Sequence, residues 1–212
     1  DVKTAIVINM LPNLVVNIID VIRGGHWGTS LGRHWRVAVY VVIGAFAGAQ
    51  YLIFGPADLL RLLLALMIFA YLLQERLARL DWSWLTRYPR SSELGFGLIG
   101  GFFSGMVNVS LPPLLIYFML LGVETTALRQ ILNLCFLGGR TTQAVTLGFA
   151  GEIRLAAALA YIPLTAVAIG GLYIGAKLQR RFSAQTYRRA LKRILFVIAI
   201  VLSYQGARYF MS

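Results

Sequence analysis

The sequence predicts an all-α integral membrane protein: a polytopic helical bundle with an inverted-topology repeat and a re-entrant hairpin made from a broken helix. Composition is the first observation behind this prediction, because 58% of the 212 residues are hydrophobic and only 13% are charged. Mean hydropathy is +0.73, a value typical of membrane proteins. The second observation is a series of apolar runs without the period-2 alternation of a membrane barrel. The third is the position of the charges between those runs.

Apolar runs follow one another along the whole chain, and no long soluble domain separates them. We therefore interpret the chain as one membrane unit. The single cysteine, Cys135, lies within a run, where a small core residue is its expected role, and an internal disulfide is excluded. The runs are Thr4–Ile22, Val37–Phe54, Leu59–Leu73, Ala127–Leu147, Leu155–Ala176 and Ile194–Phe210.

A polar, proline-bearing break divides the apolar stretch Leu94–Gly122 into two short arms. Leu94–Val107 has 14 residues and Leu114–Leu121 has 8, whereas a spanning helix needs about 20. Non-helical backbone at membrane depth persists only where protein buries it or where it lines a polar cavity. Such interrupted segments are among the better sequence indicators of a transporter's substrate site, so we expect the function at this break.

Basic residues predict the topology. Fourteen of the 20 lysines and arginines fall in three segments, 23–36, 74–93 and 177–193, and all four tryptophans lie in the first two. If Leu94–Gly122 is a hairpin that enters and leaves on one side, all three basic segments are cytoplasmic, as the positive-inside rule requires. The net charge of +12 is thereby explained by the membrane, and a nucleic-acid partner is not expected.

Two halves of the chain can be aligned in opposite orientations. Gly44 and Gly48 match Gly171 and Gly175 as G-x-x-x-G-A segments, which we interpret as places of close helix approach. The predicted organisation is a first repeat over 1–73, a cytoplasmic linker over 74–93 and a second repeat over 94–212 that contains the hairpin 94–122. If the repeat is complete, roughly 30 to 45 further residues forming an equivalent hairpin are expected before Thr4.

Polar residues form a stripe on one face of the first predicted helix. Asn9, Asn13, Asn17 and Asp20 occur at helical spacing and share a face about 80° wide. Polar side chains are costly in hydrocarbon, so the stripe should face the bundle interior. Asp20 is a candidate carrier of a coupling proton; the alternative is an interfacial ion pair with Arg23.

A matching stripe of Gln130, Asn133 and Arg140 lies on the helix Ala127–Leu147. The two stripes are expected to face each other across a polar cavity, although such amides often act only as interhelical hydrogen-bond donors and acceptors. Arg140 presents a planar set of donors suited to carboxylate, sulfonate or phosphate oxygens. The alternatives for Arg140 are an ion pair with Asp20 or a side chain that extends outward to the interface.

The predicted hairpin tip, Asn108–Pro113, supplies the remaining site residues. Asn108 and Ser110 offer polar side chains, and Pro112 and Pro113 release backbone groups. A half-helix starting near Pro113 would direct exposed N–H groups and partial positive charge at the tip, which favours an anion. The alternative is a structural re-entrant loop that holds no ligand.

At these residues the chain resembles a known family. The runs GFFSGMVNVSLPPLLIYFMLLG and ALRQILNLCFLGGRTTQAVTLGFAGEI resemble the second half of the sulfite exporter TauE/SafE family, and MLPNLVVNIIDVIRGGHW, GAFAG and GPADLLRLLLAL resemble its first half. The resemblance implies bacterial inner-membrane permeases that move sulfur-containing anions such as sulfite or organosulfonates. The family's glycine-rich tip maps onto Met106–Pro113. Pro112 and Pro113 match, but Asn108, Ser110 and Leu111 stand where glycines are common.

The leading hypothesis is a secondary anion transporter in the bacterial inner membrane, an exporter of small sulfur-containing anions by that resemblance. A non-transporting membrane scaffold that retains the fold is the alternative. An enzyme is not expected, because H-E-x-x-H, G-x-S-x-G and paired intramembrane aspartates do not occur, and His26 and His34 lie in a basic segment. No metal or cofactor is predicted. The expected partners are the anion and the lipid bilayer, with a homo-oligomer left open.

Overall fold

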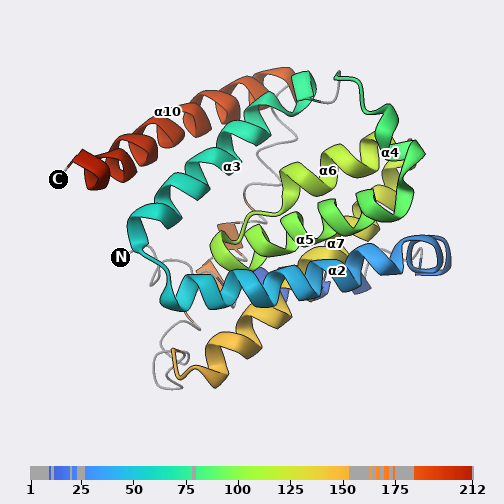
Figure 1. The fold of residues 1–212 in the computed structure, drawn as a ribbon, viewed down its shortest axis with the longest axis horizontal. Helices are drawn as coiled ribbons and strands as arrows, with labels where there is room; N and C mark the ends of the chain where they lie inside the picture. The colour runs from blue at the N-terminus through green and yellow to red at the C-terminus, as the bar shows by residue number, and fades with distance from the viewer. Residues whose placement is uncertain are drawn as a thin grey trace.

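The structure is a computed structural model in which every described element is an α-helix (Figure 1). It describes residues 10, 12–19, 21–22, 27–77, 80–152, 163, 166–167, 170–171, 174 and 184–211. Within these residues α10 lies beside α3, while α2 packs against both α5 and α7. The helices are α2 (Trp27–Phe54), α3 (Ala57–Leu77), α4 (Ser83–Arg87), α5 (Pro89–Val107), α6 (Leu111–Leu120), α7 (Thr125–Phe149) and α10 (Ala184–Met211).

Glycines bring α2 and α5 into backbone contact. A Cβ on Gly101 of α5 would lie 2.7 Å from the Cα of Val41, and one on Gly105 would lie 2.7 Å from the carbonyl carbon of Ala45. In the same way, a Cβ on Gly48 of α2 would meet the backbone of Phe102 in α5. Small residues at four-residue intervals allow this approach, which confirms the interpretation of Gly44 and Gly48 as close-contact residues. The paired residue numbers rise together, so α2 and α5 are parallel.

Helices α5 and α6 form an antiparallel hairpin. A Cβ on Gly100 would meet the Leu114 side chain. Farther from the tip, the rings of Phe96 and Tyr117 stack with their centroids 5.2 Å apart. Between the helices only residues 108–110 are non-helical. Asn108 adopts the left-handed conformation with φ 63°, which asparagine accepts more readily than most residues.

Helix α7 runs parallel to α2 and in the direction opposite to the described residues between 10 and 22. Val37 and Val41 pack in one cluster with Ile131 and Cys135, and further along both helices Leu52 packs in another with Leu147. Gln130, near the start of α7, bonds to Val21, whereas Leu147, near its end, belongs to the same apolar cluster as Met10. The described residues between 10 and 22 therefore run opposite to α7, and the inverted repeat itself stays a prediction.

Two apolar clusters hold the helices together. Helix α3 covers the tip end of the hairpin, and α10 lies on α3, where Phe69 and Phe196 meet edge to face at 6.3 Å. At the start of α3, Arg61 pairs with Asp58 one turn earlier. The first cluster comprises Met10, Leu52, Leu60, Met67, Phe103, Met106, Val107 and Leu147. The second comprises Val37, Val41, Leu85, Leu114, Tyr117, Phe118, Ile131, Leu132 and Cys135.

The helices extend beyond the predicted apolar runs into the basic segments. Helix α2 begins ten residues before Val37, α5 five residues before Leu94, and α10 ten residues before Ile194. Residues 184–193 are therefore helical instead of a loop. The reason is that hydropathy locates the apolar part of a helix, whereas an established helix continues through good helix formers such as arginine, lysine and alanine.

Of the described helices, the stretch His34–Phe54 in α2 is the one that is long and apolar enough to cross a membrane by length and composition. Helix α7 contains Gln130, Asn133, Arg140 and Gln143, which lower its hydropathy. Independent support comes from apolar side chains at the surface: Ile43, Phe46, Ile194, Val197 and Tyr204 are all at least half exposed, as expected of a surface in contact with lipid.

Candidate functional site

The candidate site lies where the end of α5 meets the middle of α7. We define the tip cluster as Ser104, Asn108, Arg140 and Gln143. The last carbonyl groups of a helix have no partner within the helix, and at the end of α5 the N–H groups of Asn108 and Val109 both bond to the carbonyl of Phe103. Other carbonyls at this helix end must therefore find partners elsewhere.

Arg140 supplies one of these partners. Its Nη2 donates to the carbonyl oxygen of Asn108 at 2.5 Å, and the residue is only 8% exposed. Its Nε and Nη1 are buried and have no hydrogen-bond partner among the described residues. The partial negative charge at the end of α5 stabilises the guanidinium. Asn108 and Arg140, both predicted site residues, are thus in direct contact. The outward-extending alternative for Arg140 is wrong, because the side chain is buried.

Gln143 supplies the second partner and was not among the predicted site residues. Its Nε2 donates to the carbonyl oxygen of Gly105 at 2.6 Å, and the residue is fully buried. Its Oε1 has no partner in the part of the chain that the structure describes. Gln143 follows Arg140 by three residues, so extending the polar stripe by one helical step would have found it.

Ser104 completes the tip cluster between α5 and α7. The residue is fully buried, and its Oγ has no hydrogen-bond partner among residues with a described position. A Cβ on Gly139 would lie 3.0 Å from the Ser104 Cβ and closer still to its Oγ. Gly139 therefore provides the space into which the hydroxyl of Ser104 projects.

The two prolines lie inside α6 instead of at its boundary. Helix α6 begins at Leu111, and both Pro112 and Pro113 are buried in its first turn. The predicted start near Pro113 is therefore wrong by two residues. Proline is compatible with a first turn because N–H groups there have no acceptor within the helix. Ser110 precedes α6 as its N-cap and is 3% exposed, without a capping hydrogen bond from its side chain.

The rest of the predicted stripes does not join the tip cluster. Gln130 donates to the carbonyl of Val21 at 3.3 Å, the interhelical hydrogen bond that the alternative interpretation describes. It stands ten residues before Arg140, or about 15 Å along the helix axis. Asn133, Asn13 and Asn17 are half-buried.

Two residues of the predicted stripe on the first helix have no described position. Asn9 and Asp20 lie outside the described residues.

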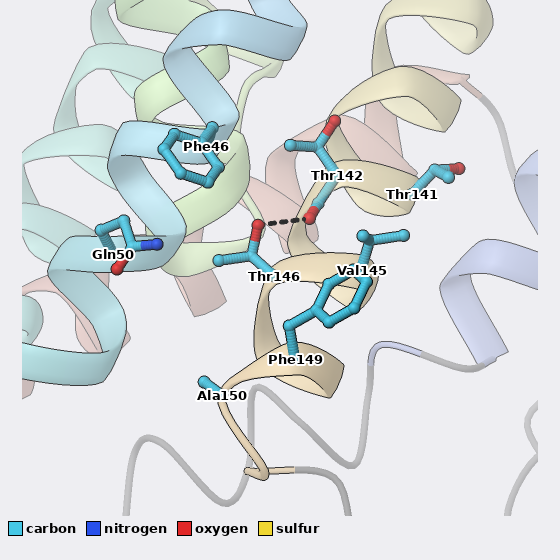
Figure 2. Close-up of a pocket in the computed structure, with 8 residues that line it drawn as sticks. All are labelled: Phe46, Gln50, Thr141, Thr142, Val145, Thr146, Phe149 and Ala150. Carbon is cyan, nitrogen blue, oxygen red and sulfur yellow. Dashed lines mark hydrogen bonds between the residues drawn. The ribbon is translucent and has the colours of Figure 1, made fainter.

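A groove between α2 and α7 lies away from the tip cluster. It encloses about 580 Å³, and Figure 2 shows Phe46 and Gln50 of α2 facing Thr142 and Thr146 of α7 across it. The Thr146 hydroxyl donates to the carbonyl of Thr142 at 2.8 Å. At 100° per residue, the groove side of α7 is nearly opposite to the side that carries Arg140. The groove is therefore a separate surface.

A second cavity, of about 400 Å³, lies at the open end of the hairpin. His34, Glu93 and Glu124 line it together with Tyr117. No group of three histidine, cysteine or acidic residues is close enough to hold a metal ion within the described ranges. Neither cavity includes Arg140, so the tip cluster is defined by its hydrogen bonds and burial.

A chain whose described elements are all helices, with an apolar surface, a broken hairpin and a buried arginine at the hairpin tip, has the construction of a membrane transporter. The profile of the family described as Sulfite exporter TauE/SafE matches residues 1–202. The chain therefore belongs to the sulfite exporter TauE/SafE family, a family of membrane transporters. No curated protein and no solved structure matches the chain.

Proposed function

We propose that this protein is a secondary transporter that exports small sulfur-containing anions, such as sulfite or organosulfonates, across the bacterial inner membrane. The observation that carries the proposal is Arg140, a buried cation whose Nε and Nη1 have no partner among the described residues. Membership of the TauE/SafE family supplies the substrate class. Alternating access is proposed to occur around the hairpin tip, with the segments 23–36, 74–93 and 177–193 in the cytoplasm.

Electrostatics explains why an anion suits this position. An arginine remains charged in a protein, and a buried charge is costly unless it is paired. The bond to the carbonyl of Asn108 satisfies one donor with a neutral acceptor. A sulfite or sulfonate group would bring a full negative charge and several acceptor oxygens, which suit the planar donor geometry of a guanidinium.

Other predicted residues have supporting roles in this proposal. Ser110 and the first turn of α6, with Pro112 and Pro113, lie directly after Asn108 in the chain and would border the anion. The half-buried Asn13, Asn17 and Asn133, with Asn9, would line the path between the two stripes. The carboxyl of Asp20 would carry a coupling proton.

The test is uptake into proteoliposomes. Sulfite and methanesulfonate uptake is measured with and without an imposed pH gradient, and saturable uptake is expected. Arg140→Ala should lower uptake about 10- to 100-fold, the usual effect of losing a hydrogen bond to a charged group. Arg129→Ala is the matched control, because Arg129 is an exposed arginine on the same helix. Equal uptake by folded Arg140→Ala protein would contradict the anion-binding role.

The scaffold alternative also has an observation in its favour. Arg140 and Gln143 both donate to backbone carbonyls at the end of α5, those of Asn108 and Gly105, and such bonds can serve only to hold two helices together. If so, Arg140→Ala would lower the thermal stability of the protein, and neither anion would be taken up by the unmodified chain. Uptake by the unmodified chain would exclude the scaffold as its sole role.

A further inference from the structure

Two side chains from adjacent turns of α7 hold the carbonyl end of α5. Gln143 binds the carbonyl of Gly105 at 2.6 Å and Arg140 binds the carbonyl of Asn108 at 2.5 Å. These are the carbonyls on either side of the point where α5 stops being helical. The hairpin tip is therefore attached to α7 exactly where its backbone changes conformation.

The rest of α5 is fixed independently of these two bonds. Gly97, Gly101 and Gly105 place its backbone directly against α2 over two helical turns. This close contact reaches Met106, whose backbone N would lie 3.0 Å from a Cβ on Gly48 of α2. Residues 108–110 are non-helical, and the N–H groups of Asn108 and Val109 both bond back to the carbonyl of Phe103. Loss of the bonds from α7 would therefore detach the Asn108 and Gly105 carbonyls from α7 while α5 stayed packed on α2.

The acceptor on Arg140 is a neutral carbonyl, and an anion would compete for the same guanidinium. Hydrogen bonds between two charged groups are stronger than those between a charged and a neutral group. The Nε and Nη1 of Arg140, which have no hydrogen-bond partner among the residues that the structure describes, give an anion a first point of attachment on that guanidinium. A ligand shifts a conformational equilibrium by its difference in affinity for the two states. Here the two states are the tip bound to Arg140 and the tip released from it, and the anion and the Asn108 carbonyl compete for the same guanidinium.

We propose that Arg140 and Gln143 form an anion-released latch: they hold the hairpin tip against α7 until an oxyanion replaces the Asn108 carbonyl on Arg140. The inference rests on the proposed function, because it requires an anion at Arg140. It adds that binding and tip movement are coupled, and that Gln143 opposes binding by stabilising the closed tip.

The experiment reports tip exposure in the full chain. Val109, a half-buried tip residue, is changed to cysteine in a Cys135→Ser background, and the rate of maleimide labelling is measured in detergent. Methanesulfonate is the probe, since sulfite itself adds to maleimides. Its binding is measured separately by isothermal titration. The labelling rate should rise with methanesulfonate along the same saturation curve as binding.

Gln143→Met tests the latch without altering Arg140. Methionine has a similar length but leaves the carbonyl of Gly105 without its donor, so the closed tip is destabilised. Labelling without ligand should increase, and the affinity for methanesulfonate should rise about two- to tenfold, because loss of one neutral hydrogen bond removes part of the conformational cost of binding. Thr142→Val is the control, because the Thr142 hydroxyl donates within α7, to the carbonyl of Gly138.

The outcomes separate the two proposals. Binding of methanesulfonate with an unchanged labelling rate would overturn the latch and leave the transporter proposal standing. Absence of binding to the unmodified protein would overturn both. If Gln143→Met fails to fold, the latch is still tested by the dependence of Val109→Cys labelling on methanesulfonate in protein that retains Gln143. A weaker affinity in folded Gln143→Met protein would contradict the latch.

Discussion

Replacing Gly101 by alanine tests the close packing of α5 on α2. The new Cβ would lie 2.7 Å from the Cα of Val41 and closer still to its carbonyl oxygen, and ordinary contact begins at 3.4 Å, so the helices must separate locally by more than about 0.7 Å. The obstructing atoms are backbone, which cannot rotate away. Separation also disturbs the reciprocal contact of Gly48 with Phe102.

The magnitude follows from two opposing effects. Overpacking costs about 1–3 kcal/mol, whereas alanine is favoured over glycine within a helix by up to about 1 kcal/mol. The net expectation for Gly101→Ala is a loss of about 1–2 kcal/mol, since the overpacking cost exceeds the helical gain. For a chain of this size that loss corresponds to a fall of about 2–8 °C in the unfolding temperature.

The assay is thermal unfolding of the purified protein in detergent, with Gly95→Ala as the matched control. Gly95 lies on the same helix, and a Cβ there would meet nothing within 4 Å, so only the helical gain applies. Gly95→Ala should therefore raise the unfolding temperature by up to about 4 °C. If both alanines shift the unfolding temperature in the same direction, the close α2–α5 contact described here is wrong.

Three further predictions concern the site. Gly139→Ala should destabilise by about 1 kcal/mol. Ser104→Ala should relieve part of this, since the atom nearest to a Cβ on Gly139 is the Ser104 Oγ, which alanine lacks; a double-mutant cycle in thermal unfolding should give a coupling of at least about 0.5 kcal/mol, and additivity would exclude the contact. Asn108→Val should cost about 1–2 kcal/mol while Asn108→Gly is tolerated, because the left-handed backbone at φ 63° suits glycine and disfavours a β-branched residue; equal unfolding temperatures would contradict that conformation. Asp20→Asn should flatten the pH dependence of uptake in proteoliposomes if its carboxyl carries the coupling proton, and an unchanged profile would leave Asp20 an interfacial charge.

Much of the fold was predictable because hydropathy and helix-breaking residues act locally. The apolar runs located α2, α3, α7 and α10, and the break between Val107 and Leu114 marked a hairpin. Helix ends were predicted less well, since charged helix formers extend helices past their apolar parts. The proline pair was misplaced for a related reason, because proline near a break fits the first turn of the next helix as well as the loop before it.

The candidate site was predictable only in part. A buried arginine within an apolar run attracts notice in any sequence, and Arg140 does lie at the hairpin tip, against Asn108. Gln143 was missed because a glutamine at the end of a polar stripe has no feature that separates it from an ordinary interhelical contact. Ser104 was missed because serine is common in glycine-rich helices, and its position depends on the space left by Gly139.

The sequence by itself determined the class of protein, the broken hairpin and the family, because composition, local backbone preference and the order of motifs are properties of the chain alone. Only the tertiary structure decided which residues meet. It brought Arg140 and Gln143 to two carbonyls 32 and 38 residues earlier in the chain, and it paired the glycines of α5 with α2. Such contacts depend on the register between packed helices. Register is set by side-chain volumes on both surfaces at once, which no local pattern in one segment contains.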